Sequence, residues 1–164
     1  MKRTTAVQRT GRMLVKLIPA PWDLHVFIAN VSQHRGRPIN VVNYDFGAES
    51  KISGAWRAGG DDDTILIAAT ATGLRREAIV AHEVAHMMLG HSPADLGFVG
   101  EAAMADVMPM MLVADSELAR KFLFRHAYER AAEADAERLA TLIITAITAG
   151  PANLTAQHVT NSLS

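Results

Sequence analysis

The feature that most constrains this chain is the segment His-Glu-Val-Ala-His at residues 82–86. On a helix, two histidines four residues apart lie on one face, with Cβ atoms about 5–6 Å apart. Both imidazoles can then reach one zinc ion at about 2.0–2.1 Å. The motif therefore predicts a helix over residues 74–89 that carries one zinc ion, and the apolar residues that would keep this site dry are Ile79, Val80, Val84 and Met87.

Glu83 supplies the third chemical group of the motif. It is rotated only about a third of a turn from His82, so its carboxylate can reach a water molecule in the open position of the metal. Zinc lowers the pKa of such a water toward about 7, and the carboxylate accepts its proton as the oxygen attacks a carbonyl. This combination is typical of zinc-dependent hydrolysis, with Glu83 as general base.

A third protein ligand must come from elsewhere. His91 is the nearest candidate, but it is nine residues past His82, which places it on the other face if the helix continued. The long metzincin motif also fails, because position 89 is Leu and position 92 is Ser. His91 is therefore expected either simply at the helix end or as an outer partner of the site, rather than as a ligand.

The helical pattern that extends to residue 149 offers a better candidate. Its apolar stripe follows helical spacing, and Glu133 falls within the stripe. Glu129 falls there too, and Glu137 lies on its edge. Buried carboxylates need a cation or hydrogen-bond partner, which zinc would supply. The spacing alone leaves open a solvated acidic face paired with Arg125, Arg130 and Arg138.

Composition narrows the alternatives. The 164 residues include no cysteine, which excludes disulfides, thiolate nucleophiles and cysteine-containing zinc sites. A formal net charge of -1 gives no basic field for nucleic acid or anionic lipid, so we expect neither as a direct partner. The N-terminus has no convincing signal peptide, and the apolar run at residues 139–149 is shorter than the roughly 20 residues that span a bilayer. We expect a cytoplasmic protein.

Turn and cap signals divide the chain into short elements. We expect an arm or short helix over residues 1–20, one domain over residues 21–150 and a tail over residues 151–164. Within the domain, Asp23 caps a helix to residue 34, a strand covers residues 39–44, and Gly90 ends the motif helix. Strands at 53–57 and 64–68 flank a turn and predict a hairpin. Residues 92–115 fit no single element, and Ser116 begins a helical pattern. The fold class is α+β, with a small, mostly antiparallel sheet packed on the motif helix and further helices around it.

Three ordered segments resemble the ImmA/IrrE-type metallopeptidases: SGAWRAGGDDDTILIA, then HEVAHMMLGH, then EADAERLA at residues 133–140. The resemblance covers roughly residues 21–144. It implies a zincin-like domain with zinc bound by His82, His86 and Glu133, Glu83 as general base, and Glu137 orienting a liganding histidine. Glu137 stands where Asp or Asn is common, and the stretch before Glu133 is long, so Glu129 is the alternative third ligand.

The same resemblance implies the biology. Members of the family typically cleave or otherwise inactivate a repressor-like transcriptional regulator, so the expected function is a zinc-dependent endopeptidase with a helix-turn-helix regulator as protein substrate. The alternative is a non-proteolytic protein that zinc stabilises and that controls a partner by contact. Two imidazoles and a carboxylate would also accept manganese.

The remaining residues have simpler interpretations. Trp56 is expected to pack in the core, with a substrate-binding strand as the alternative. His126 and Tyr128 could stabilise an oxyanion or lie on the surface. The methionine-rich residues 104–111 are expected to fill the core, with a flexible lid that grips a peptide as the alternative. Residues 61–63 are expected to form an exposed turn.

Overall fold

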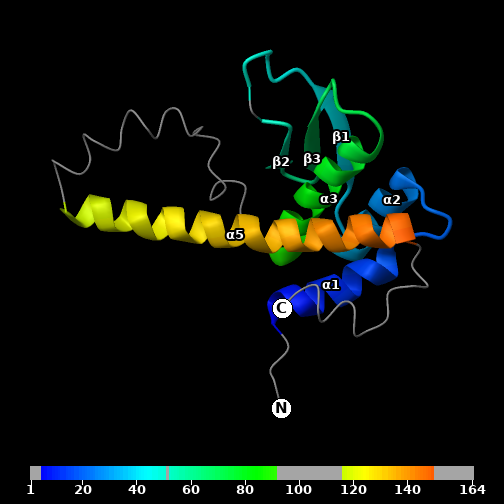
Figure 1. Cartoon of the computed structure of the whole chain (residues 1–164), viewed down its shortest axis with the longest axis horizontal. Helices are drawn as coiled ribbons and strands as arrows, with labels where there is room; N and C mark the ends of the chain where they lie inside the picture. The colour runs from blue at the N-terminus through cyan, green and yellow to red at the C-terminus, as the bar shows by residue number, and fades with distance from the viewer. Residues whose placement is uncertain (1–4, 51, 92–115, 150–164) are drawn as a thin grey trace.

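The computed structural model describes residues 5–50, 52–91 and 116–149, and its description of side chains resumes at Arg130 after the second gap. Within these ranges the fold is α+β, with four helices and one three-stranded sheet (Figure 1). The helices are α1 (Ala6–Leu17), α2 (Leu24–Arg35), α3 (Gly73–Leu89) and α5 (Ser116–Ala149). The strands are β1 (Ile39–Tyr44), β2 (Gly54–Ala58) and β3 (Asp63–Ala68).

The sheet has the order β1-β3-β2 and is mixed. β2 and β3 form the expected antiparallel hairpin, in which Gly54 faces Ile67 and Ala58 faces Asp63. β1, however, pairs with β3 in parallel, from Ile39 opposite Asp63 onward. The prediction of a mostly antiparallel sheet is therefore wrong, because β3 inserts between the two strands that precede it in the chain.

Arg37 accounts for much of this arrangement. It lies just before β1, and its guanidinium donates to the carbonyl oxygens of Gly59 and Asp62 in the hairpin turn, each at 2.9 Å. The backbone N–H of Asp63 also donates to the carbonyl of Pro38 at 2.9 Å. These contacts place the start of β1 beside the start of β3, a pairing that no local turn signal encodes.

A charged side chain, that of Asp63, is buried where β1 and β3 begin. Asp63 is 1% exposed, and Arg35 donates to its Oδ2 at 2.7 Å. The prediction that residues 61–63 form an exposed turn is thus wrong for Asp63, although Asp61 is exposed. The side chain of Asp63 points inward because it begins the alternation in which Ile65 and Ile67 are also buried.

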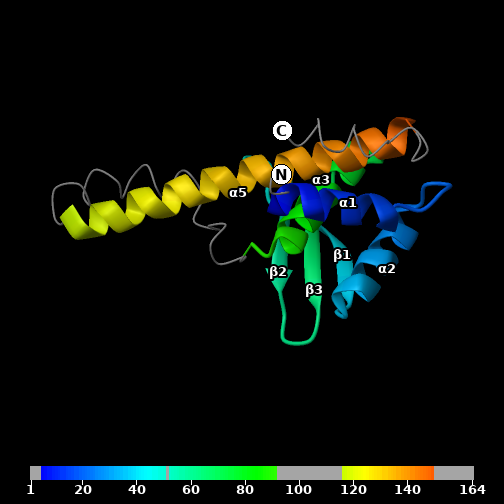
Figure 2. The ribbon, with the colours of Figure 1, turned by 90° about the horizontal axis from the view of Figure 1, so that it is seen from below.

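α3 is the central helix of the fold. It lies between the sheet and α5 (Figure 2), and most of its second half is buried. On α5, the predicted apolar stripe is buried from Ala132 to Ile143, and Ile147 is partly buried. Both helices place small side chains in this contact region. The buried alanines are Ala81 and Ala85 on α3, and Ala132, Ala136 and Ala140 on α5.

The ends of the helices follow the expected local signals. The carboxylate of Asp23 accepts from the backbone N–H of Val26 at 3.0 Å and begins α2. α3 ends at Gly90, whose φ of 73° lies in the left-handed region that favours glycine. These boundaries agree with the prediction to within one residue.

The N-terminal segment is a helix rather than a loose arm. Thr5 and Gln8 form a capping box at the start of α1. Val7, Gly11 and Leu14 are buried, and α1 contacts α2, α3 and α5. It is thus part of the core. Among the described helices, none has the length and apolar character that crossing a membrane requires.

Candidate metal centre

Two histidines on α3 face each other one helical turn apart. The Nε2 atoms of His82 and His86 are 3.0 Å apart. The side chain of His86 is 2% exposed and that of His82 is 24% exposed. The pair therefore lies at the edge of the core, with one ring enclosed and the other reaching toward solvent.

Glu133 completes the cluster from α5. Its two carboxylate oxygens lie 3.2 Å from the Nε2 atoms of His82 and His86, one oxygen to each ring. The ligand atoms of the three residues lie within 4.8 Å of one another, so the group can hold a metal ion. The structure thus brings together the three residues expected as ligands. The side chain of Glu129, the alternative third ligand, lies outside the described residues.

The spacing of these atoms fits a divalent cation. Ligands about 2.0–2.1 Å from a tetrahedral zinc ion lie roughly 3.3–3.4 Å from each other. The distances here are 3.0 and 3.2 Å. Two imidazoles and a carboxylate converge here, and a divalent cation can accept a lone pair from each of the three side chains. The residues present therefore fit zinc, and the same donor set also suits manganese.

The outer ring nitrogens have partners as well. Nδ1 of His86 lies 2.9 Å from Nδ1 of His91. Nδ1 of His82 lies 3.4 Å from Oε2 of Glu137, which is longer than an ordinary hydrogen bond. Such outer partners fix the orientation of a liganding imidazole. His91 and Glu137 therefore occupy the positions expected of residues that orient the two rings.

Charge within the cluster shifts two pKa values. Burial acts to lower the pKa of His82, but the hydrogen bond to Glu133 and the nearby carboxylates outweigh it, so this pKa lies above its usual value. Hydrogen bonds from His82 and His86 hold the pKa of Glu133 far below its usual range. Glu133 is therefore ionised at neutral pH, the form in which a carboxylate binds a metal.

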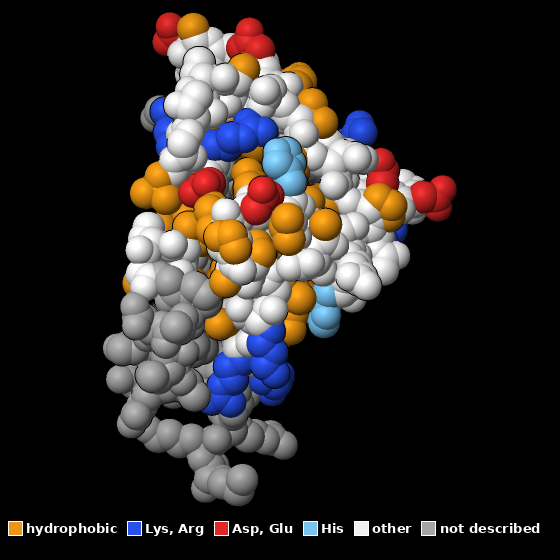
Figure 3. Space-filling model, turned by 90° about the vertical axis from the view of Figure 1, so that its right-hand side faces the viewer, with side chains coloured by type: hydrophobic (Ala, Val, Ile, Leu, Met, Phe, Trp, Pro, Cys, Tyr) orange, Lys and Arg blue, Asp and Glu red, His pale blue; other side chains and the backbone are white. Residues whose placement is uncertain are grey.

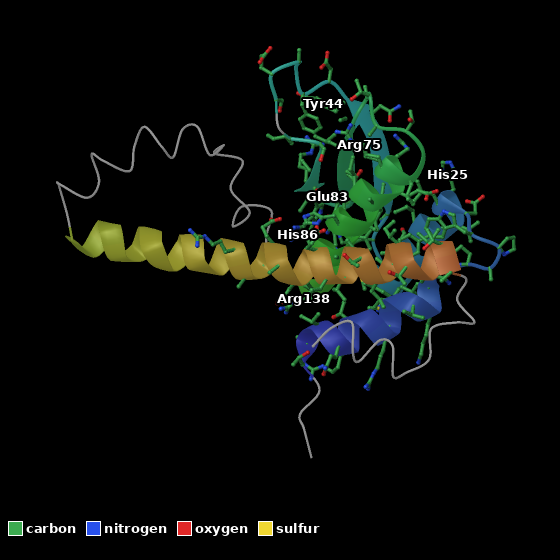
Figure 4. The ribbon with its side chains drawn as sticks, viewed as in Figure 1. His25, Tyr44, Arg75, Glu83, His86 and Arg138 are labelled. Atoms are coloured by element: carbon green, nitrogen blue, oxygen red, sulfur yellow. The ribbon has the colours of Figure 1, made fainter. Side chains whose placement is uncertain are left out.

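Glu83 is buried beside the histidine pair, with 8% exposure (Figure 4). Burial raises the pKa of its carboxyl, and the charges of His82 and His86 offset part of this effect. A backbone hydrogen bond from Trp56 of β2 also acts on this carboxylate. Trp56 itself packs in the core, as expected.

Gly54 is a site residue that the sequence analysis missed. A Cβ at this position would meet the side chain of Ile79 and come within 3.1 Å of Oε1 of Glu83. Only glycine therefore lets β2 approach α3 closely at the carboxylate. The available signal was a glycine at the start of a strand, which often marks close approach of a backbone.

A cavity of about 370 Å³ opens beside the cluster. It brings together residues of α3, α5 and the segment at the start of β2. Arg75, two helical turns before His82, is a second cavity residue that the sequence analysis missed. The residues that line the cavity are Ser53, Gly54, Arg75, Ala78, Ile79, His82, Glu83 and Glu137.

Other candidates do not join the site. His25 and His34 lie on α2, and His25 lines a second hollow between α2 and β1. Figure 3 shows hydrophobic side chains on one face of the molecule, mixed with histidine and charged side chains. The side chains of His126 and Tyr128, and residues 92–115 with their methionines, lie outside the described residues.

No family model, curated protein or solved structure matches this chain. The resemblance to ImmA/IrrE-type metallopeptidases thus stays a prediction from the sequence motifs. The function must be argued from the geometry of the site.

Proposed function

We propose that this chain is a cytoplasmic zinc-dependent endopeptidase of the ImmA/IrrE type, with a zincin-like domain. One observation carries the proposal: a buried glutamate, Glu83, lies directly beside three converging metal-ligand side chains and lines an adjoining cavity. A metal that served only to hold the fold together would not require a buried carboxylate next to its ligands.

His82, His86 and Glu133 would hold the ion. A bound zinc ion supplies Lewis-acid activation of water and of a peptide carbonyl. Glu83 accepts the proton of the attacking water at a carboxylate oxygen and passes it to the amine that leaves when the peptide bond breaks. Burial keeps the Glu83 carboxylate beside the metal-ligand side chains and largely out of bulk water. His91 and Glu137 orient the two liganding rings through Nδ1.

The position of β2 supports a peptide as substrate. Among the described strands, β2 pairs only with β3. On its other edge the backbone N–H of Trp56 donates to Glu83, and the backbone groups of Gly54 and Ala58 face the same edge. Gly54, at the start of this strand, lines the cavity together with Glu83. An extended peptide that added along the same edge of β2 would pass the proposed base.

A helix-turn-helix transcriptional regulator is the proposed protein substrate. Support for this choice comes from the three sequence segments that resemble the ImmA/IrrE type, and cleavage or inactivation of a repressor-like regulator is the activity which that resemblance implies.

The test compares Glu83→Gln with the wild-type chain. Both are loaded with zinc, checked by elemental analysis and incubated with a purified helix-turn-helix regulator as candidate substrate. Loss of the base should leave one zinc per chain and reduce cleavage by about 10²–10⁴-fold, measured by the intact mass of the regulator. Glu77→Gln is the matched control, because it makes the same change on α3 and keeps an acceptor for the indole N–H of Trp22.

Cleavage by Glu83→Gln at the wild-type rate would exclude Glu83 as the base. If the regulator keeps its full mass with the wild-type chain but is released from DNA by both proteins, the function is non-proteolytic control by contact. A chain that binds no zinc at all would contradict both functions.

A further inference from the structure

One face of α3 leads from the metal cluster to a basic side chain. Arg75, Ala78, Ile79 and His82 follow the spacing that places residues on a single helix face, and all four line the cavity beside the cluster. Figure 4 shows Glu83 between Arg75 and His86, with Arg75 nearer the start of α3. The cavity therefore has a metal-ligand end and an arginine end.

Among the described residues that line this cavity, Arg75 is the only Lys or Arg. Within the described part of the chain, its exposed guanidinium makes no hydrogen bond or ion pair. The neighbouring Arg76, in contrast, donates to Oδ1 of Asn43. Arg75 is thus left available at the mouth of the cavity.

The acidic side chains of the cavity are engaged at its other end. Glu137 contacts Nδ1 of His82, and Glu83 is buried with a backbone hydrogen bond from Trp56. Neither makes an ion pair with Arg75. A ligand that enters the cavity therefore meets a positive group that the protein itself leaves uncompensated.

We infer that Arg75 binds a carboxylate of the peptide substrate, from an aspartate or glutamate side chain or from a chain end. A guanidinium pairs with a carboxylate through two parallel hydrogen bonds, a geometry that lysine or a neutral donor does not reproduce. The inference rests on the proposed function only in taking the ligand to be a peptide.

The distance along α3 sets the position of the carboxylate. Seven residues of helix separate Arg75 from His82, which is about 10 Å along the axis. An extended peptide advances about 3.3 Å per residue, so the acidic residue lies about three residues from the peptide bond at the metal end. The cleft would therefore select substrates by a charge that is remote from the cleaved bond.

The binding experiment uses the full-length chain carrying Glu83→Gln, loaded with zinc and immobilised. A pool of synthetic decapeptides with all side chains at equal abundance is passed over it, and retained peptides are sequenced by mass spectrometry. Acidic residues should be enriched about fivefold at one position. Adding Arg75→Gln should remove the enrichment, and adding Arg75→Glu should replace it with lysine and arginine. Lys16→Gln, which removes an exposed positive charge of α1 outside the cavity, should leave it unchanged.

Equal enrichment with and without Arg75→Gln, or retention of no peptide, would overturn the inference. A second arm gives the same pool to the wild-type chain and sequences the products. Cleavage without an acidic preference overturns the inference and leaves the endopeptidase function standing. Enrichment that depends on Arg75, without any cleavage, supports the inference and contradicts the endopeptidase function.

Discussion

Two clusters of charged and polar side chains both involve α3, and they differ in the residues they contain. The first surrounds Asp63, which receives Arg35 at 2.7 Å and has Arg37 at 3.4 Å. Arg35 also donates to the carbonyl of Met87 near the end of α3, at 2.9 Å. This cluster supplies its own cations and ties the sheet to α3.

The second cluster has the opposite composition. His82, His86 and Glu133 converge with two imidazole nitrogens and a carboxylate, and no Lys or Arg of the described chain pairs with Glu133. In the first arrangement arginines of the chain itself offset the buried carboxylate, whereas the second has the side chains to hold a cation from solution. The two clusters therefore lead to different predictions, one for stability and one for metal binding.

The largest expected effect is on stability. Asp63→Ala leaves two arginines without their shared carboxylate, and breaking a buried pair in this way costs about 3–5 kcal/mol. Urea unfolding of the metal-free protein measures this loss, with Asp61→Ala, an exposed neighbour, as control. The folded fraction should still bind one zinc ion. Unchanged stability would mean that the Asp63 cluster does not hold the scaffold.

The next effect is on metal affinity. Glu133→Ala removes one of three protein ligands, so zinc affinity should fall by more than the roughly 100-fold that loss of an outer partner can cost. Competition with a chelating dye measures it, and Asp135→Ala is the control on the same helix. Because Glu133 is 53% exposed, unfolding of the metal-free protein should change little. Retained affinity would assign the third ligand to another carboxylate.

A smaller effect is expected from the outer partners. His91→Ala frees the ring of His86 to rotate, which should lower zinc affinity about 10–100-fold. Glu137→Gln should act near the lower end of that range, because the Glu137 contact is longer and its side chain is 73% exposed. Competition with the same chelating dye measures the zinc affinity of both variants. A larger loss of zinc affinity in Glu137→Gln than in His91→Ala would show that the exposed Glu137 contact contributes more to metal binding.

The smallest effect is that of pH. Zinc binds only the neutral imidazole, so a proton on His82 competes with the metal. The carboxylates around His82 raise its pKa, so affinity should begin to fall at a higher pH than for an ordinary histidine, by about tenfold per pH unit below that pKa. Zinc titrations between pH 5 and 8, roughly the range of histidine ionisation, test this. Glu137→Gln removes one of these carboxylates, so in this variant zinc affinity should begin to fall at a lower pH.

Local signals made much of the site predictable. His82, Glu83 and His86 follow from one motif, and Asp23 and Gly90 mark helix ends through their own backbone geometry. The third ligand was harder to predict, because helical spacing places Glu129, Glu133 and Glu137 all on or beside the apolar stripe. The choice among them depends on how α5 lies against α3, which no single segment specifies.

Non-local packing accounts for what the sequence did not predict. The parallel pairing of β1 with β3 depends on Arg37 reaching the hairpin turn. The burial of Asp63 follows from that pairing. Gly54 and Arg75 became site residues because β2 lies against α3, and the sequence offered only a general signal for Gly54, a glycine at the start of a strand.

The buried alanines between α3 and α5 have a consequence for how this protein can change. Interaxial distances between packed helices are about 8–10 Å and depend on the side chains at the contact. Glu133 on α5 reaches the rings of His82 and His86 on α3, so its carboxylate oxygens move with any change in the spacing of the two helices. Larger side chains in place of the buried alanines would therefore alter the metal site without changing a ligand.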